Sequence, residues 1–351
     1  MGPHLLLLPE FMKNTRPTST EFHPDFYQVA ERWEAWWHGL NDTPLIYRAE
    51  TAADAGVPKG KLFDRLDQPE AWVVAREKQL LAERRFGDAV PYIRVDLGPV
   101  VIGAFLGAPI EFSTEQNTSW QHPILDEVAE AMNLGLDEDN LWWTRVQALT
   151  RALAQRAAGR YCVAMPDLSG PIDLLANLRG SENLCMDLFE ERDVIATAAD
   201  HLTDIWHQVY QRLNTIVHEA GAATVHWLGC WSDSVYTVPT CDFNALISPE
   251  DYQEVCLPSY RKQSRLAGRV CVHLDGPDAA RHAETLAATP EFTAIQYTPG
   301  AGTPSALAKL EMFRMFQEAG KPLLVITPPE EVEEMSRCLH PEGLALWTAP
   351  C

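Results

Sequence analysis

Short apolar runs alternate with longer helical patterns along most of the chain, and this alternation restricts the possible folds more than any other feature. Strands separated by helices normally pair in parallel through right-handed crossovers. Eight such strands predict an α/β fold of the (β/α)8 TIM-barrel type. The expected strands are residues 44–50, 89–95, 161–165, 224–228, 270–272, 293–297, 323–326 and 344–347. Helices are expected over 24–39, 69–86, 140–159, 172–178, 181–189, 194–220, 277–287, 304–319 and 329–339, with another beginning at Ser248.

The pattern also predicts the domain organisation. Residues 1–22 are rich in Pro, Thr and Ser without periodicity, which indicates a flexible N-terminal arm. Residues 23–351 are expected to form a single barrel domain with an N-terminal helical extension, in which Trp33, Trp36 and Trp37 pack against the core. An irregular insertion at about residues 100–135 is of the kind that lines or covers a site.

Composition limits the classes of partner. The 351 residues carry a formal net charge of −21, which opposes binding to nucleic acid or to an anionic membrane surface. A small-molecule substrate is therefore expected, and a homodimer is compatible with the sequence. The eight cysteines are dispersed without a CxxC pair, which is typical of buried thiols in a reducing compartment. No segment approaches the roughly 20 apolar residues of a membrane span, so we expect a soluble, cytoplasmic protein.

Polar residues follow several of the predicted strands directly. His273 and Asp275 end the strand that contains Val270, Cys271 and Val272, and side chains two apart on a strand share a face. Asp96 and Asp167 likewise follow strands. Carboxyl ends of strands carry the chemistry in α/β barrels, so we expect these groups to share one cleft. The alternative is that His273 merely ends a core strand and Asp275 caps the next helix.

Other residues are candidates for substrate binding. Trp120, Trp231 and Tyr297 could wall an apolar pocket or stack on a methylamine or a sugar, and core packing is the alternative. Asp233 lies in the loop after the 224–228 strand. Arg179 is a candidate for an anionic group, with a surface salt bridge as the alternative. Several acids in one cleft should raise one another's pKa values or recruit a cation.

Four stretches resemble the uroporphyrinogen decarboxylase superfamily, which also contains corrinoid-dependent methyltransferases and is built on a (β/α)8 barrel. Residues 90–98, with Asp96, resemble its first barrel strand and catalytic aspartate, and residues 167–172 resemble a Gly-Pro turn. Residues 248–258 resemble a Ser-Pro helix that ends in Leu-Pro. His273-Leu-Asp-Gly276 resembles the His-x-Cys-Gly of the methyltransferase branch. The resemblance runs from about residue 90 to the end of the chain.

The resemblance implies a zinc site. In the methyltransferase branch, His-x-Cys and a late Cys hold a zinc ion that ionises a substrate thiol. In this chain Asp275 replaces the first Cys, and Cys351 falls near the place of the late Cys. A set of His273, Asp275 and Cys351 is chemically acceptable for zinc, with one oxygen in place of a sulfur. The alternative is that the metal has been lost.

Three functions follow as hypotheses. The first is methyl transfer from a small methylated substrate to a thiol or to a corrinoid-protein acceptor, assisted by zinc, with Asp96, Asp167 and His273 as catalytic residues. Any corrinoid would be carried by a partner protein. The second is a metal-free decarboxylase or lyase. It ranks lower because the Arg-rich segment that grips a polycarboxylate in that branch is not found before Asp96. The third is a barrel that binds a small sugar or amine without turnover.

Overall fold

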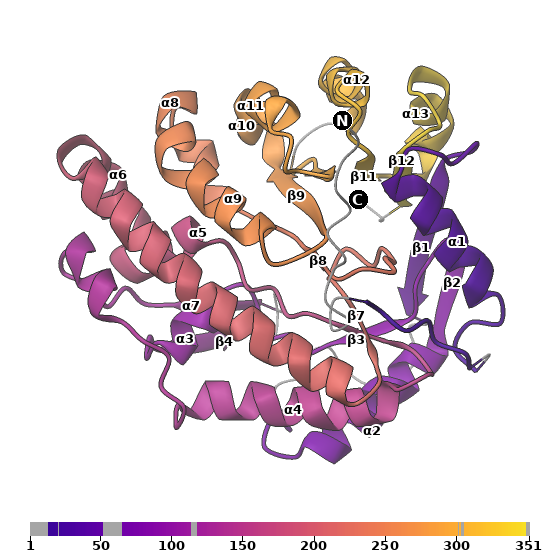
Figure 1. Cartoon of the computed structure of the whole chain (residues 1–351), viewed down its shortest axis with the longest axis horizontal. Coiled ribbons are helices and arrows are strands. Elements are labelled where there is room, and N and C mark those ends of the chain that lie inside the picture. Colours follow the sequence, from indigo (N-terminus) through magenta and orange to yellow (C-terminus); the bar gives the residue numbers. More distant parts are fainter. Residues whose placement is uncertain are drawn as a thin grey trace, which may run out of the picture.

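The computed structural model of the chain describes residues 13–19, 21–51, 65–113, 118–300, 302 and 305–348. It is a mixed α/β structure in which helices form an outer arc around the strands (Figure 1). Within these ranges, none of the helices combines the length and apolar character that a membrane crossing requires. The α-helices are α1 Phe26–Trp37, α2 Pro69–Ala82, α3 Val101–Phe105, α4 Leu141–Ala157, α5 Pro171–Arg179, α6 Ser181–Glu190, α7 Arg192–Glu219, α8 Pro249–Asp251, α9 Leu257–Ser264, α10 Gly276–Ala279, α11 Ala283–Ala288, α12 Leu310–Glu318 and α13 Val332–Cys338.

Most strands belong to two parallel sheets. The larger has the order β2-β1-β12-β11-β10-β9-β8, in which β2 alone is antiparallel to its neighbour. The smaller has the order β3-β6-β7. Strands β4 and β5 form a separate antiparallel hairpin. The bounds are β1 Leu45–Thr51, β2 Glu83–Gly87, β3 Tyr92–Arg94, β4 Ile110–Ser113, β5 Thr118–Gln121, β6 Cys162–Ala164, β7 Ala223–Val225, β8 Tyr236–Thr237, β9 Arg269–Asp275, β10 Ala294–Thr298, β11 Leu323–Thr327 and β12 Leu344–Thr348.

The eight strands expected from the sequence correspond to β1, β3, β6, β7, β9, β10, β11 and β12. The prediction of a parallel α/β fold is therefore confirmed. In the part of the chain that is described, no backbone pairing joins the two parallel sheets, so hydrogen bonds alone do not close them into a barrel.

Several elements differ from the expectation. The helix expected over 69–86 ends at Ala82, and the next residues form β2 on the edge of the larger sheet. Gly87 ends this strand with a φ of +60°, and a Cβ there would meet the Ile46 carbonyl oxygen, so the sharp return requires glycine. The insertion at 100–135 is more regular than expected, because it holds α3, the β4–β5 hairpin and the 3₁₀ helix η3, Val128–Asn133.

Two helices begin at side-chain caps. The Ser248 hydroxyl accepts a hydrogen bond from the Asp251 backbone N–H, 3.1 Å away, and Pro249 occupies the first helical position. This start leads through the π-helical turn η5, Tyr252–Cys256, into α9. Asn140 caps α4 by accepting from the backbone N–H groups of Trp142 and Trp143. These caps fix the starts of two helices on the outside of the sheets.

Alternate residues of the strands enter two different apolar cores. On β9, Val272 packs in the outer core between the strands and the helices, whereas Cys271 points into an inner core. The inner core draws on both parallel sheets. Its strand residues are Leu45 and Tyr47, Cys162 and Ala164, Ala223 and Val225, Tyr236, Cys271, Ala294, Leu324 and Ala345. One apolar interior therefore holds the two sheets together, although no backbone ladder joins them within the described ranges.

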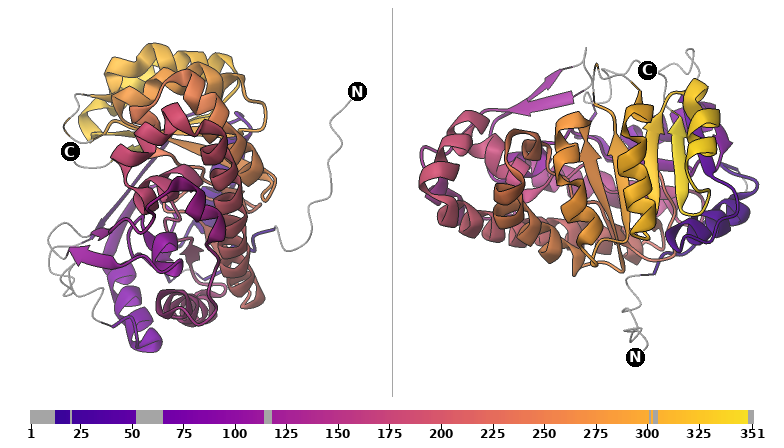
Figure 2. Two further views of the ribbon diagram at one scale, coloured as in Figure 1. Left: turned by 90° about the vertical axis from the view of Figure 1, so that its left-hand side faces the viewer. Right: turned by 90° about the horizontal axis from the view of Figure 1, so that it is seen from above.

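Helix α1 covers the amino-terminal ends of the strands. Its Trp33, Trp36 and Trp37 are buried in the inner core, so the prediction that they pack is confirmed. Each indole N–H also donates to a backbone carbonyl: Trp36 to Leu323 at the start of β11, Trp33 to Asp88, and Trp37 to Trp231. In the right-hand view of Figure 2, the indigo α1 lies on the opposite side of the molecule from the purple β4–β5 hairpin.

The described part of the N-terminal arm is anchored, which differs from the flexible segment predicted. Asn14 is 9% exposed, and its amide donates to the carbonyls of Thr224 and Ser232. Arg16 forms an ion pair with Asp233. Residues 13–19 thus bind along the domain through specific polar contacts that composition does not reveal. Residues 1–12 lie outside the described part of the chain.

Replacing Trp36 by Ala should destabilise the whole domain, because the side chain is fully buried where α1 meets the inner core. Denaturant unfolding should show a loss of about 3–5 kcal/mol, the range for large aromatic residues in cores. Leu40→Ala is the matched control, since Leu40 is 75% exposed just after α1. The control should change stability by no more than about 0.5 kcal/mol. Equal effects of the two substitutions would contradict this role for α1.

Candidate active site

A cleft of about 300 Å³ lies at the carboxyl ends of strands from both parallel sheets. Its walls are supplied by residues at or after the ends of β3, β6, β7, β8, β9, β10 and β11. The side chains that line it are Arg94, Pro99, Asp167, Ser169, Asp173, Trp227, Thr240, Asp242, His273, Asp275, Thr298 and Ile326. Asp167, His273 and Asp275 therefore lie in one cleft, as expected from the sequence.

His273 is fixed in orientation by a neighbouring strand. Its Nδ1 is hydrogen-bonded to Oε1 of Gln296, a fully buried residue that pairs with it in register on β10. The Gln296 amide nitrogen donates to the Thr298 hydroxyl at 3.0 Å, which turns its oxygen towards the imidazole. Because the Gln296 oxygen can only accept, Nδ1 is the donor of this bond, which leaves the lone pair of the neutral imidazole tautomer on Nε2. The Trp227 ring meets the imidazole edge to face, with 5.1 Å between the ring centroids.

Three side chains of the cleft form a group that could hold a metal ion. One ligand atom from each of Asp242, His273 and Asp275 lies within 4.8 Å of the others. His273 Nε2 is 4.0 Å from Oδ1 of Asp242. The Asp275 Oδ1 atom is buried and has no hydrogen-bond partner among the described residues. A buried carboxylate oxygen without a partner is costly, and a bound cation would satisfy it.

The loop that carries Asp242 is held by a buried acid of α5. Asp173 accepts hydrogen bonds from the backbone N–H groups of Phe243 at 2.8 Å and Asp242 at 3.0 Å. Burial raises the pKa of Asp173 to about 7, and the negative charge of Asp242 adds to the shift. The same loop also packs closely against the residue before α5, because a Cβ on Gly170 would meet the Thr240 carbonyl oxygen. Asp173 therefore acts as a positioning residue.

The remaining charged groups flank this centre. Asp167 accepts a hydrogen bond from the Ser169 N–H at 2.9 Å, and burial raises its pKa although Arg94 and His273 oppose the shift. The Asp242 side chain is 70% exposed to the cleft, yet partial desolvation by the surrounding walls raises its pKa, with His273 opposing. Arg94 lines the cleft and is ion-paired with Asp96.

The predicted catalytic residue Asp96 lies one step behind the cleft wall. Besides its ion pair with Arg94, its carboxylate accepts a hydrogen bond from the Gly98 N–H at 3.2 Å. It is not among the side chains that line the cleft. In this arrangement Asp96 can influence the cleft through its ion pair with Arg94, which lines the cleft.

A second hollow of about 370 Å³ adjoins the cleft and shares Pro99, Ser169, Asp173 and Asp242 with it. Trp120 of β5 lines this hollow and is 48% exposed. The β4–β5 hairpin of the insertion therefore forms one wall beside the cleft, as expected for an insertion that borders a site.

Three predicted substrate-binding residues lie elsewhere. Trp231 is fully buried in the inner core, and its indole N–H donates to Asp233. Asp233 is ion-paired with Arg16. It lies near the amino-terminal end of β9, away from the cleft, because the chain after β7 turns back towards that end before β8 begins. Arg179 is ion-paired with Asp187 at 2.8 Å, which matches the salt-bridge alternative.

Tyr297 and Cys351 complete the predicted set. Tyr297 points outward from β10 and packs on Phe313 of α12, with 5.3 Å between ring centroids. Side chains alternate along a strand, so the residues before and after Tyr297 point inward instead. Its burial raises the pKa of its hydroxyl to about 12. Cys351 lies outside the described residues.

Sequence reasoning missed Asp173, Trp227, Thr240 and Asp242, which line the cleft, and Gln296, which is buried behind His273. Gln296 could have been found, because a glutamine inside the apolar run Ala294–Thr298 needs a polar partner. Asp242 had no such signal. It follows the two-residue strand β8, which is too short to show periodicity.

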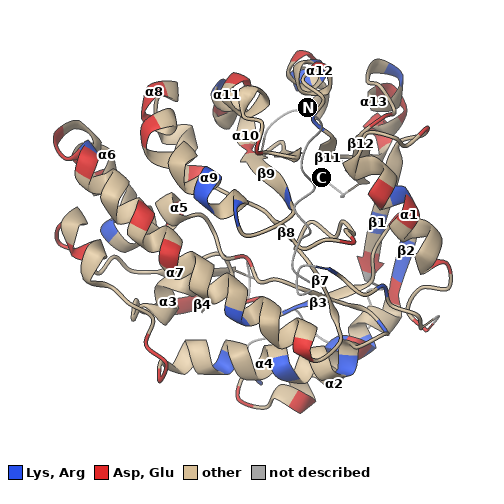
Figure 3. Cartoon of the chain, in the orientation of Figure 1, with Lys and Arg blue, Asp and Glu red and all other residues tan. Residues whose placement is uncertain are grey.

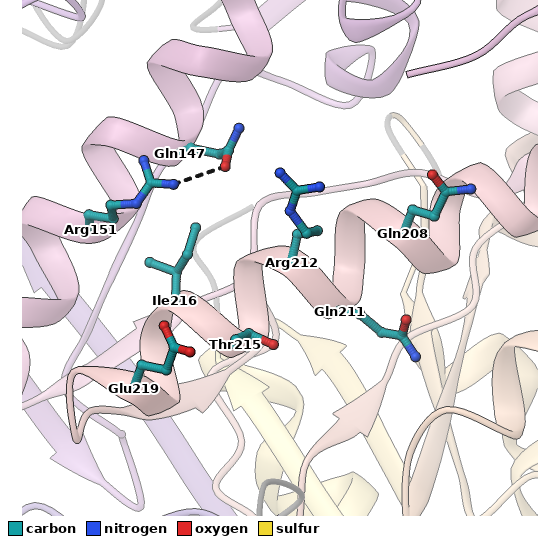
Figure 4. Close-up of a pocket in the computed structure, with 8 residues that line it drawn as sticks. All are labelled: Gln147, Arg151, Gln208, Gln211, Arg212, Thr215, Ile216 and Glu219. Carbon is teal, nitrogen blue, oxygen red and sulfur yellow. Dashed lines mark hydrogen bonds between the residues drawn. The ribbon is translucent and has the colours of Figure 1, made fainter. Parts of the chain in front are cut away.

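A separate hollow of about 490 Å³ lies on the outside of the molecule between α4 and α7 (Figure 4). It is larger than the cleft, but its lining consists of helix side chains such as Gln147, Arg151 and Arg212. None of the lining residues belongs to the strand ends, so we do not assign the chemistry to it.

No family model and no curated protein matches the chain. Among solved structures, it is similar to a methyltransferase from Methanosarcina mazei, with a TM-score of 0.60 and 13% sequence identity. The similarity covers 92% of this chain and 93% of that chain. At this identity the likeness is one of fold, and it extends over nearly the whole of both chains.

The pH dependence of stability should reveal the buried Asp173. Its folded-state pKa of about 7 exceeds the unfolded value of about 3.9, so only the folded chain keeps this proton between those pH values. Stability should therefore fall as pH rises from about 4 to 7, with this group contributing at most about 1.4 kcal/mol per pH unit. Asp173→Asn should flatten the fall, measured by urea unfolding at several pH values.

Glu182→Gln serves as the control, because Glu182 is exposed on α6 and its replacement should leave the slope unchanged. Coincident slopes for the wild type and Asp173→Asn would contradict a buried, protonated Asp173.

Proposed function

We propose that the chain is a zinc-assisted methyltransferase built on a (β/α)8 barrel. The observation that carries the proposal is the group Asp242, His273 and Asp275, in which one carboxylate oxygen is buried and has no partner among the described residues. The fold likeness to a methyltransferase supports it. The acceptor of the methyl group would be a thiol or a corrinoid protein, in keeping with the family resemblance of the His273 to Gly276 stretch.

The barrel is part of the proposal. The inner apolar core contains residues of both parallel sheets, and the outer core contains the alternate residues of the same strands. This division is what a closed barrel requires, since one face of every strand then points inward. The shared cleft at the carboxyl ends supports the same arrangement.

The donor set fits zinc. Zinc accepts imidazole nitrogen and carboxylate oxygen, and three protein ligands leave a position open for a substrate. The predicted third ligand, Cys351, lies outside the described residues, and among the described residues Asp242 is the group that joins His273 and Asp275. A zinc ion held there would favour the thiolate form of a thiol acceptor at neutral pH.

The other residues in and behind the cleft wall have separable roles. Gln296 keeps the proton of His273 on Nδ1, so that Nε2 faces Asp242 and Asp275. Asp173 fixes the backbone on which Asp242 stands. Asp167, with its raised pKa, would serve as the acid or base of the cleft. Asp96 would act through Arg94, whose guanidinium it orients.

The decarboxylase alternative is less well supported. A substrate with several carboxylates needs several cations, and among the described residues that line the cleft Arg94 is the one arginine or lysine. That arginine is already paired with Asp96. Non-catalytic binding of a small ligand would leave the fixed imidazole and the unpartnered Asp275 oxygen without a purpose.

Zinc binding is the first test. Isothermal titration calorimetry and elemental analysis should give about one zinc per chain, and His273→Ala should weaken binding by more than about 100-fold, beyond the 10- to 100-fold effect of outer groups. His122→Ala is the control, because His122 is exposed and pairs with Glu111. Zinc affinity that is equal in the wild type and His273→Ala would refute the proposed site.

The role of Gln296 gives a second test. Gln296→Leu removes the acceptor for His273 Nδ1 and should lower zinc affinity about 10- to 100-fold. Gln296→Glu keeps an acceptor at the same place and should restore most of the affinity. A similar loss in both variants would show that the effect comes from disturbed packing and not from the hydrogen bond.

A further inference from the structure

We propose that the methylated substrate of this cleft is a small organic cation, such as a quaternary ammonium or a sulfonium compound. The inference rests on the proposed function, because it names the substrate class for the same site. It is carried by the charge of the cleft, its aromatic wall and a hydroxyl group that has no partner among the described residues.

The charge of the lining favours a cation. Asp167, Asp173, Asp242 and Asp275 line the cleft, and Arg94 opposes them while paired with Asp96. A divalent cation bound to Asp242 and Asp275 would neutralise the charge of those two carboxylates. Asp173 already accepts hydrogen bonds from two backbone N–H groups. Asp167 then remains as an acid that faces the ligand space. The outside differs, since α7 carries bands of both signs and α4 carries basic bands (Figure 3).

An aromatic wall and a free hydroxyl complete the recognition. Trp227 lines the cleft beside His273, and indole rings are the preferred aromatic partners of alkylated ammonium groups. Thr240 also lines the cleft and is 6% exposed, and its hydroxyl has no hydrogen-bond partner among the described residues. A buried hydroxyl without a partner indicates a ligand that supplies an acceptor or donor. The volume of about 300 Å³ suits a small ligand.

The chemistry is balanced for an onium donor. The bond between the methyl carbon and the onium nitrogen breaks, and its electron pair stays on nitrogen, which leaves as a neutral amine. The carbon forms its new bond with the sulfur of a thiolate acceptor, which becomes a neutral thioether. No proton has to reach the leaving group, and the opposite charges of donor and acceptor cancel in the step.

Calorimetry with two isosteric probes tests this inference on the full chain. Choline carries a trimethylammonium group, and 3,3-dimethyl-1-butanol has the same shape without the charge. Choline should bind at least about tenfold more tightly than the alcohol, as a desolvated cation beside an aromatic ring and a carboxylate requires. Asp167→Asn and Trp227→Leu should each weaken choline binding about tenfold or more, and Asp167→Asn should leave the alcohol unchanged.

Folding and zinc binding are controlled separately. Each variant should keep the circular dichroism spectrum and the zinc affinity of the wild type, and Trp227→Phe should recover part of the choline affinity. Equal binding of the two probes, or tighter binding of the anion 4-methoxybenzoate, by protein that binds zinc would overturn the inference and leave the proposed function intact. Selective choline binding by protein that fails to bind zinc would support the cation site and refute the zinc proposal.

Discussion

Burial of the inner strand faces against the tryptophans of α1 is the constraint on which the rest of the structure depends. It holds two sheets that share no backbone ladder in the described part of the chain as one body. Because α1 covers the amino-terminal ends, polar side chains on the inner faces are directed to the carboxyl ends. Strand β9 shows the transition along one face, from Cys271 in the inner core to His273 and Asp275 in the cleft.

The candidate metal ligands are positioned by groups that are not ligands themselves. Gln296 orients the imidazole of His273, and Asp173 anchors the backbone of Asp242. Both supporting groups are buried, so their hydrogen bonds are shielded from competition by water. Asp275 contrasts with them, because its buried Oδ1 has no hydrogen-bond partner in the described part of the chain. The supporting groups have their hydrogen-bond partners, whereas the Asp275 oxygen has none among the described residues, and such a site is suited to binding a cation.

The sequence predicts the parallel strands because each is a distinct apolar run, and it predicts the common face of His273 and Asp275 because that follows from the period of two. The prediction that Tyr297 lines the site is wrong. The sequence does not reveal which of two alternating sets of side chains on β10 points inward, and the packing of Tyr297 on Phe313 shows that its set points outward. Trp231 and Asp233 were misplaced because the chain after β7 returns to the opposite end before β8. Asp242 depends on its long-range anchor, Asp173, which no local pattern indicates.

X-ray absorption spectroscopy of the zinc-loaded full chain tests the central claim most directly, because it reports the ligand atoms around the metal. We predict only nitrogen and oxygen neighbours at about 2.0–2.2 Å, from His273, Asp242, Asp275 and solvent. A sulfur neighbour at about 2.3 Å would indicate that Cys351 or another cysteine holds the metal. That result, or the absence of bound zinc, would contradict a zinc site formed by His273, Asp242 and Asp275.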